Sequence, residues 1–157
     1  MTFLLDVNVL YILHQPRHTD FQLVDDWFTF HRQSRFATSP ITQAGLVRLL
    51  MRNLSQMETY IREEATLSLR QFTRLPNHVY WPDSPSYLEA VDAIMARVQG
   101  HRQITDAYLL GLAIHNGGKL ATLDRGIVHL AGPDFAGHVE YIARETTFPA
   151  TAKRAAG

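Results

Sequence analysis

Short apolar runs that alternate with longer amphipathic segments are the feature of this chain that most limits its fold. The apolar runs lie at residues 2–5, 36–38, 78–81, 119–123 and 139–142, and segments of mostly helical pattern lie between them. Apolar strands separated by helices are typical of a parallel sheet that helices cover on both faces. The sequence therefore predicts an α/β protein, a three-layer α/β/α sandwich with a short-stranded, mainly parallel central sheet.

The expected helices have recognisable starts and ends. Helical spacing of apolar residues covers residues 20–33, 40–52, 56–73, 86–98 and 105–116, with shorter helical turns after Asp6 and over 126–130. Ser39 and Thr105 stand where an N-cap is expected, because a hydroxyl there accepts a hydrogen bond from a free backbone N–H. Asp106 then falls in the first turn of its helix, where the helix dipole favours negative charge.

The composition indicates one folded domain without cysteine chemistry. The chain has 157 residues, 46% of them hydrophobic, and no cysteine, which excludes disulfides, thiol catalysis and Cys-ligated metals. We expect the domain to span residues 1–145 and residues 146–157, which lack an apolar pattern, to form a flexible tail. No apolar run approaches the roughly 20 residues that cross a bilayer, and no basic signal-peptide segment opens the chain. A cytoplasmic protein without membrane association is the simplest interpretation.

The charge balance limits how this protein can bind nucleic acid. Fifteen basic and fifteen acidic residues give a formal net charge of zero, which argues against a broad basic surface. Binding of nucleic acid would therefore need a metal ion, a local arginine cluster or a partner chain.

Aspartates at the tips of three apolar elements are the candidate site. Asp6 follows the run at 2–5, Asp124 follows the run that ends at Leu123, and Asp106 lies at a helix start. Ligands of parallel α/β sheets bind at the carboxyl ends of the strands, so the three carboxylates can converge there. Grouped carboxylates repel one another, and a divalent cation relieves that repulsion.

Oxygen ligands alone select a hard ion, Mg²⁺ or Mn²⁺. The chemistry that such a site best supports is hydrolysis of a phosphate ester, since the ion acidifies water and neutralises developing charge. We expect Asp6 and Asp106 to be the principal metal ligands and catalytic residues. Asp124 is expected to act through water or to hold a second ion.

Other residues near these aspartates have two interpretations each. Asn8 either orients a carboxylate or caps the short helix that follows Asp6. Thr105 can touch the site, although capping alone explains it. Arg102 and Arg125 flank two of the aspartates and can contact an RNA phosphate backbone, although exposed arginines are common.

Several other chemistries are unsupported. The eight histidines form no metal-binding signature, and no phosphate-binding or dinucleotide-binding glycine motif occurs. A haloacid-dehalogenase-like phosphatase would use a strand-end Asp as nucleophile with a second Asp two residues later, but this chain has Asn8 there.

Four segments in order give the chain a family resemblance. They are Phe3-Leu4-Leu5-Asp6-Val7-Asn8-Val9-Leu10, Ala37-Thr38-Ser39-Pro40-Ile41-Thr42-Gln43, His101-Arg102-Gln103-Ile104-Thr105-Asp106-Ala107-Tyr108-Leu109 and Leu120-Ala121-Thr122-Leu123-Asp124-Arg125. Each is short, but the set resembles the PIN domain and, more narrowly, the VapC-type toxins of bacterial toxin–antitoxin pairs. The resemblance extends from Met1 to about Ile142.

This resemblance implies a PIN-like fold and a Mg²⁺-dependent endoribonuclease that cleaves RNA phosphodiester bonds. The metal ligands of the family match Asp6 and Asp106, with a further aspartate at Asp124. The resemblance also implies a cognate VapB-type antitoxin that blocks the site, a homodimer, and transfer or ribosomal RNA as substrate.

One position departs from the family pattern. The family usually has a glutamate early in the helix after the second strand, and the aligned residue here is Gln43. An amide can ligate through its carbonyl oxygen but supplies no charge and no general base, so metal affinity is expected to be lower unless Asp83 or Glu89 compensates. The alternative function is therefore a catalytically weak or inactive PIN-like domain that binds RNA or protein.

Overall fold

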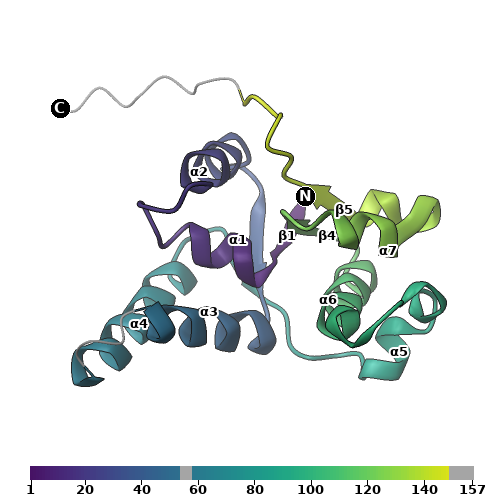
Figure 1. Ribbon diagram of the computed structural model, residues 1–157, viewed down its shortest axis with the longest axis horizontal. Helices are drawn as coiled ribbons and strands as arrows, with labels where there is room; N and C mark the ends of the chain where they lie inside the picture. The colour runs from purple at the N-terminus through teal and green to yellow at the C-terminus, as the bar shows by residue number, and fades with distance from the viewer. Residues whose placement is uncertain (54–57, 149–157) are drawn as a thin grey trace.

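The computed structural model describes residues 1–53 and 58–148 (Figure 1). Residues 56 and 57 of the helix predicted at 56–73 lie outside this part of the chain. Among the described helices, none combines the length and the hydrophobicity needed to cross a bilayer.

A five-stranded sheet forms the centre of the molecule. Its strands, in spatial order, are β3 (His78–Tyr80), β2 (Arg35–Thr38), β1 (Thr2–Leu5), β4 (Lys119–Thr122) and β5 (Val139–Tyr141), and every neighbouring pair is parallel. Along the chain, β2 and then β3 are added on one side of β1, and β4 and β5 are then added on its other side. The sheet therefore has its topological switch point between β1 and β4, and sheets of this kind bind ligands at the carboxyl ends of the strands there.

Helices cover both faces of the sheet, which confirms the predicted three-layer α/β/α architecture. Phe3 and Leu5 of β1 face a core shared with α1 (Val7–Ile12), α2 (Phe21–Phe30), α3 (Pro40–Asn53) and α4 (Glu58–Thr73). Leu4 faces the opposite core, which it shares with α5 (Tyr87–Val91), α6 (Ile104–His115) and α7 (Arg125–Phe135). The alternation follows from the two-residue repeat of a strand, which sends successive side chains to opposite faces.

The helix predicted over 86–98 is wrong in its extent. Ser86 and Glu89 form a capping box that starts α5, but the helix ends at Val91 and a 3₁₀ turn follows at Met95–Arg97. Ile94 is fully buried in the core with α6. Apolar spacing could not reveal this break, because two successive short turns can bury the same residues as one continuous helix.

Close packing fixes α5 against α6. A Cβ atom at Gly111 of α6 would lie 2.1 Å from the carbonyl oxygen of Ala90 in α5, so only glycine fits at this contact.

In α7, the predicted end at Gly132-Pro133 appears as a kink, since Gly132 has a φ of 58° and the helix continues to Phe135. Positive φ is readily adopted by glycine.

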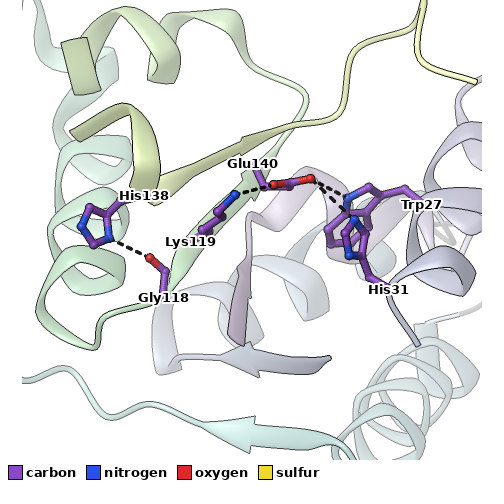
Figure 2. A network of polar contacts seen from close by, with 6 residues as sticks. All are labelled: Trp27, His31, Gly118, Lys119, His138 and Glu140. Carbon is purple, nitrogen blue, oxygen red and sulfur yellow. Dashed lines mark hydrogen bonds and ion pairs between the residues drawn. The ribbon is translucent and has the colours of Figure 1, made fainter. Parts of the chain in front are cut away.

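A polar network fastens α2 to the edge of the sheet (Figure 2). Glu140 of β5 accepts a hydrogen bond from Lys119 Nζ at 3.1 Å and another from Trp27 Nε1 at 3.5 Å. The His31 Nε2 atom lies 3.6 Å from the same carboxylate. Glu140 therefore joins β4 and β5 to α2, a helix that lies far from both strands in the sequence.

The C-terminal segment makes one contact that the sequence did not indicate. The ring of Phe148 packs against Phe30 of α2, with 5.7 Å between ring centroids. Residues 149–157 lie outside the described part of the chain, so the flexible tail at 146–157 stays a prediction.

Candidate active site

Asp6 lies directly after β1, at the switch point between β1 and β4. Its backbone N–H donates to the carbonyl oxygen of Ala121 at 3.0 Å, which extends the strand pairing by one residue. The Thr122 hydroxyl donates to Asp6 Oδ2 at 2.7 Å. Because Asp6 is only 6% exposed, this hydrogen bond provides much of the stabilisation of its buried charge.

Asp124 follows β4 and is held by the same threonine. Its backbone N–H donates to the Thr122 hydroxyl at 3.0 Å, while its Oδ1 accepts from the Gly126 N–H at 2.7 Å. The second contact makes Asp124 the N-cap of α7. Asp124 therefore has a structural role beside any role in chemistry.

Asp106 projects from the first turn of α6, as predicted, but the predicted cap is wrong. Helix α6 begins at Ile104 and its N-cap position is Gln103, without a side-chain capping bond. A 3₁₀ turn at His101–Gln103 runs directly into the helix, which places exposed Thr105 inside the helix. The preceding turn thus replaces the cap that the threonine would have supplied.

The fold places the three aspartates near enough to one another for their charges to interact. Burial, and then the negative charges of Asp6 and Asp124, raise the pKa of Asp106 to about 6. Burial also raises the pKa of Asp6, against the hydrogen bond from Thr122 and the backbone N–H groups of Val7 and Asn8. Carboxylates influence one another in this way only at short range, so the predicted convergence of the three is present in the fold.

The cluster is open rather than cage-like. In the described part of the chain, no three His, Asp or Glu side chains already surround a point where a metal ion could be held. Mg²⁺ usually takes one or two protein carboxylates and completes its shell with water and phosphate. An open acidic cluster with raised pKa values fits that kind of ion, because a cation would relieve the repulsion between its members.

Comparison with known proteins identifies the family. The model of the PIN domain matches residues 3–133. The chain belongs to the PIN domain family. Ribonuclease VapC39 of Mycobacterium tuberculosis is 37% identical over 143 residues, which cover 90% of this chain and 100% of that protein. Ribonuclease VapC29 of the same species is 42% identical over 132 residues, covering 84% of this chain and 92% of the relative.

Solved structures share this PIN fold at low sequence identity. The VapBC2 structure from Rickettsia felis, bound to a promoter DNA fragment, matches with a TM-score of 0.60 and 14% identity over 90% of this chain and 98% of the matched chain. The FitAcB structure from Neisseria gonorrhoeae matches with a TM-score of 0.59 and 20% identity over 89% and 97% of the two chains. These likenesses support the fold alone.

Gln43, the residue at which a departure from the family pattern is expected, belongs to a hydrogen-bonded chain. Its Nε2 donates to the Thr38 hydroxyl at 2.9 Å, and the Thr38 hydroxyl lies 2.8 Å from His78 Nε2. Thr38 is the fully buried last residue of β2, the strand beside β1. Gln43 is therefore anchored at the carboxyl end of the sheet through Thr38.

Thr38 and Thr122 are functional candidates that the sequence analysis missed. Each ends a strand with the same Ala-Thr pair, at the edge where the aspartates gather. A hydroxyl residue at the last position of a buried strand was the available signal. Threonine is also common in strands for steric reasons, so the signal alone did not distinguish a polar anchor from an ordinary strand residue.

Of the two interpretations of Asn8, capping of the short helix is wrong. The N-cap of α1 is Asp6, and exposed Asn8 lies inside the helix. The backbone N–H of Asn8, together with that of Val7, favours the charged form of the Asp6 carboxyl and so lowers its pKa. Asn8 thus acts on Asp6 through its main chain.

The two arginines flank the acidic cluster on exposed positions. Arg125 is the first residue of α7, next to Asp124, and Arg102 lies in the turn before α6. Neither forms a salt bridge with a described residue. Contact with an RNA backbone stays a prediction for both.

Proposed function

We propose that this PIN domain is a Mg²⁺-dependent endoribonuclease toxin of the VapC type. The observation that carries the proposal is the grouping of Asp6, Asp106 and Asp124, since burial and then the charges of Asp6 and Asp124 raise the pKa of Asp106 to about 6. Relatives named ribonucleases at 37% and 42% identity support RNA as the substrate. The proposed place of action is the cytoplasm, where such RNA is found.

In this proposal, Asp6 and Asp106 hold Mg²⁺, or Mn²⁺ in its place, and Asp124 acts through water or beside a second ion. When bound, the ion supplies positive charge to the reacting phosphate and lowers the pKa of a water molecule. The chain's own contribution is to hold its carboxylates in fixed positions at the carboxyl ends of β1 and β4. The 2.7 Å hydrogen bond from Thr122 does so for Asp6.

Gln43 and the two arginines complete the proposed site. Because the Gln43 amide donates from Nε2 to Thr38, its carbonyl oxygen is the atom that remains to face a cation. Arg102 and Arg125 would contact the RNA backbone beside the cleavage point, since guanidinium groups bind phosphate well. These two arginines would give the site a local positive charge, although the net charge of the chain is zero.

The proposed partners are a VapB-type antitoxin and a second copy of this chain. Support for the antitoxin comes from the relatives' names and from the VapBC2 structure, whose description names such a complex. Transfer or ribosomal RNA is the proposed substrate class. Size-exclusion chromatography of the protein, alone and co-expressed with its neighbouring reading frame, would test both assemblies.

A second candidate is a catalytically weak or inactive PIN-like domain that binds RNA or protein. The observation that favours it is Gln43, because its amide adds no charge to the acidic cluster. Incubation of purified protein with transfer and ribosomal RNA in Mg²⁺, with and without chelator, separates the two. Chelator-sensitive cleavage supports the endoribonuclease, and intact RNA after prolonged incubation supports the second candidate.

A further inference from the structure

A cavity of about 330 Å³ opens beside the acidic cluster. It lies between the first turn of α3, the segment before α5 and the first turn of α6, and Figure 1 shows that this segment runs between α3 and α6. Its lining includes Ile41, Asp83, Ser86, Tyr87, Thr105 and Tyr108. The volume is at the small end of the range for ligand sites, about 300 to 1,000 Å³, which suits one planar ring better than a whole nucleotide.

The cavity and the proposed cleavage site share one helical turn. Thr105 lines the cavity, and the next residue, Asp106, interacts with the charges of Asp6 and Asp124. A group seated in the cavity would therefore lie within one helical turn of Asp106, one of the carboxylates that are proposed to act on the phosphate.

Aromatic rings give the cavity a flat, apolar wall. The rings of Tyr87 and Tyr108 are nearly parallel, with an angle of 14° and a centroid distance of 6.0 Å. The Tyr108 hydroxyl donates to the carbonyl oxygen of Pro85 at 3.1 Å, which fixes that ring. Aromatic faces are the usual seats for unstacked bases of single-stranded RNA.

Two polar groups at the cavity can bind a ligand. The Tyr87 hydroxyl is buried and has no hydrogen-bond partner within the described part of the chain, and a buried group left in this state is costly. Asp83 also lines the cavity, and its side chain is exposed. A carboxylate accepts hydrogen bonds and recognises the amino groups of bases.

We propose that this cavity binds one unstacked base of the RNA, next to the cleaved bond, and selects a base that carries an exocyclic amino group. The inference rests on the proposed function for the RNA itself. Asp83 accepts from the amino group, the Tyr87 ring packs on the base, and the Tyr87 hydroxyl receives its missing partner. Uracil is disfavoured because it lacks an exocyclic amino group.

The test measures binding to RNA without cleavage. Protein with Asp106→Asn is titrated in Mg²⁺ with four fluorescent RNA hexamers, oligouridine and three others with one central A, C or G. We expect at least one amino-bearing base to raise affinity about tenfold over oligouridine. Asp83→Asn and Tyr87→Phe, added separately, should each reduce this preference to about twofold or less, whereas the matched controls Asp92→Asn and Tyr141→Phe should retain it.

The outcomes separate this inference from the proposed function. Equal binding of all four hexamers, or a preference that survives both cavity substitutions, overturns the base site. Asp83 is exposed, so its substitution should leave folding intact, and melting curves check both variants. If the RNA-binding variant shows a base preference but the wild type never cleaves RNA, the base site is supported and the endoribonuclease is overturned. If the wild type cleaves RNA but no base preference is found, the endoribonuclease is supported and the base site is overturned.

Discussion

The Thr122 hydroxyl donates to Asp6 Oδ2 at 2.7 Å and so joins two residues that lie 116 positions apart in the chain. The same oxygen accepts the backbone N–H of Asp124 at 3.0 Å. One threonine at the end of β4 therefore sets the positions of two of the three clustered aspartates. The geometry of the site depends on the pairing of β1 with β4 as much as on the acidic residues themselves.

Replacement of Thr122 with valine, which has nearly the same shape, removes this link. We expect the free energy of unfolding to fall by about 2 kcal/mol, because the hydrogen bonds to Asp6 and from Asp124 are both lost, or by about 4 to 8 °C in Tm. RNA cleavage should fall about tenfold or more, because Asp6 loses the partner that fixes its rotamer. Thr66→Val, at an exposed position of α4, is the matched control. Unchanged cleavage by Thr122→Val would show that Thr122 does not position Asp6.

The raised pKa of Asp106 makes a prediction about metal-free stability. In the folded protein the Asp106 carboxyl has a pKa of about 6, against an ordinary value of 3.8, so it keeps its proton to a higher pH than in the unfolded chain. The stabilisation from the proton is therefore present at low pH and is lost as the pH rises through 6. In chelator, the free energy of unfolding of Asp106→Asn relative to that of the wild type should be higher at pH 7 than at pH 4 by about 1 kcal/mol. This figure allows for solvent screening at a half-buried group.

Urea unfolding at the two pH values measures this change, with Asp92→Asn as the control at an exposed site. A stability difference between Asp106→Asn and wild type that is the same at pH 4 and pH 7 would contradict the clustered arrangement of the three aspartates.

Restoring a carboxylate at position 43 should strengthen metal binding. Gln43→Glu adds a negative charge at the carboxyl end of the sheet, where the metal site is proposed, so we expect the Kd for Mg²⁺ to fall about tenfold, which corresponds to about 1.4 kcal/mol. The added repulsion should lower stability without metal, because like charges disfavour one another's ionisation. Titration calorimetry with Mg²⁺ tests the first expectation, and melting in chelator tests the second. Gln71→Glu on exposed α4 should change neither, and an unaltered Mg²⁺ affinity in Gln43→Glu would place position 43 outside the metal site.

Much of the site could be predicted because parallel strands end at one edge of a sheet. Asp6 and Asp124 follow apolar runs that had to be buried strands, so both could be placed at one edge of the sheet without knowing the strand order or register. The anchors Thr38 and Thr122 could not be recognised, because a strand-end threonine reveals its partner only once strand order and register are known. The orphan hydroxyl of Tyr87 likewise depends on the packing of α5 on α6.

The errors concern helix ends, where local preference competed with the preceding structure. Thr105 has the chemistry of an N-cap, but the 3₁₀ turn at His101–Gln103 leads directly into α6 and takes its place. Asn8 has the same chemistry, yet Asp6 occupies the cap position because β1 ends immediately before it.

The most direct test of the central claim is cleavage of RNA by the purified full chain in Mg²⁺. Transfer and ribosomal RNA should be cut at discrete sites, and chelator should stop the reaction. Asp6→Asn and Asp106→Asn, each folded by circular dichroism, should lower the rate at least about 100-fold, given the several kcal/mol that a catalytic metal supplies, whereas Asp92→Asn should match the wild type. Cleavage that persists in chelator, or in a folded Asp106→Asn protein, would contradict a metal-dependent site built on these aspartates.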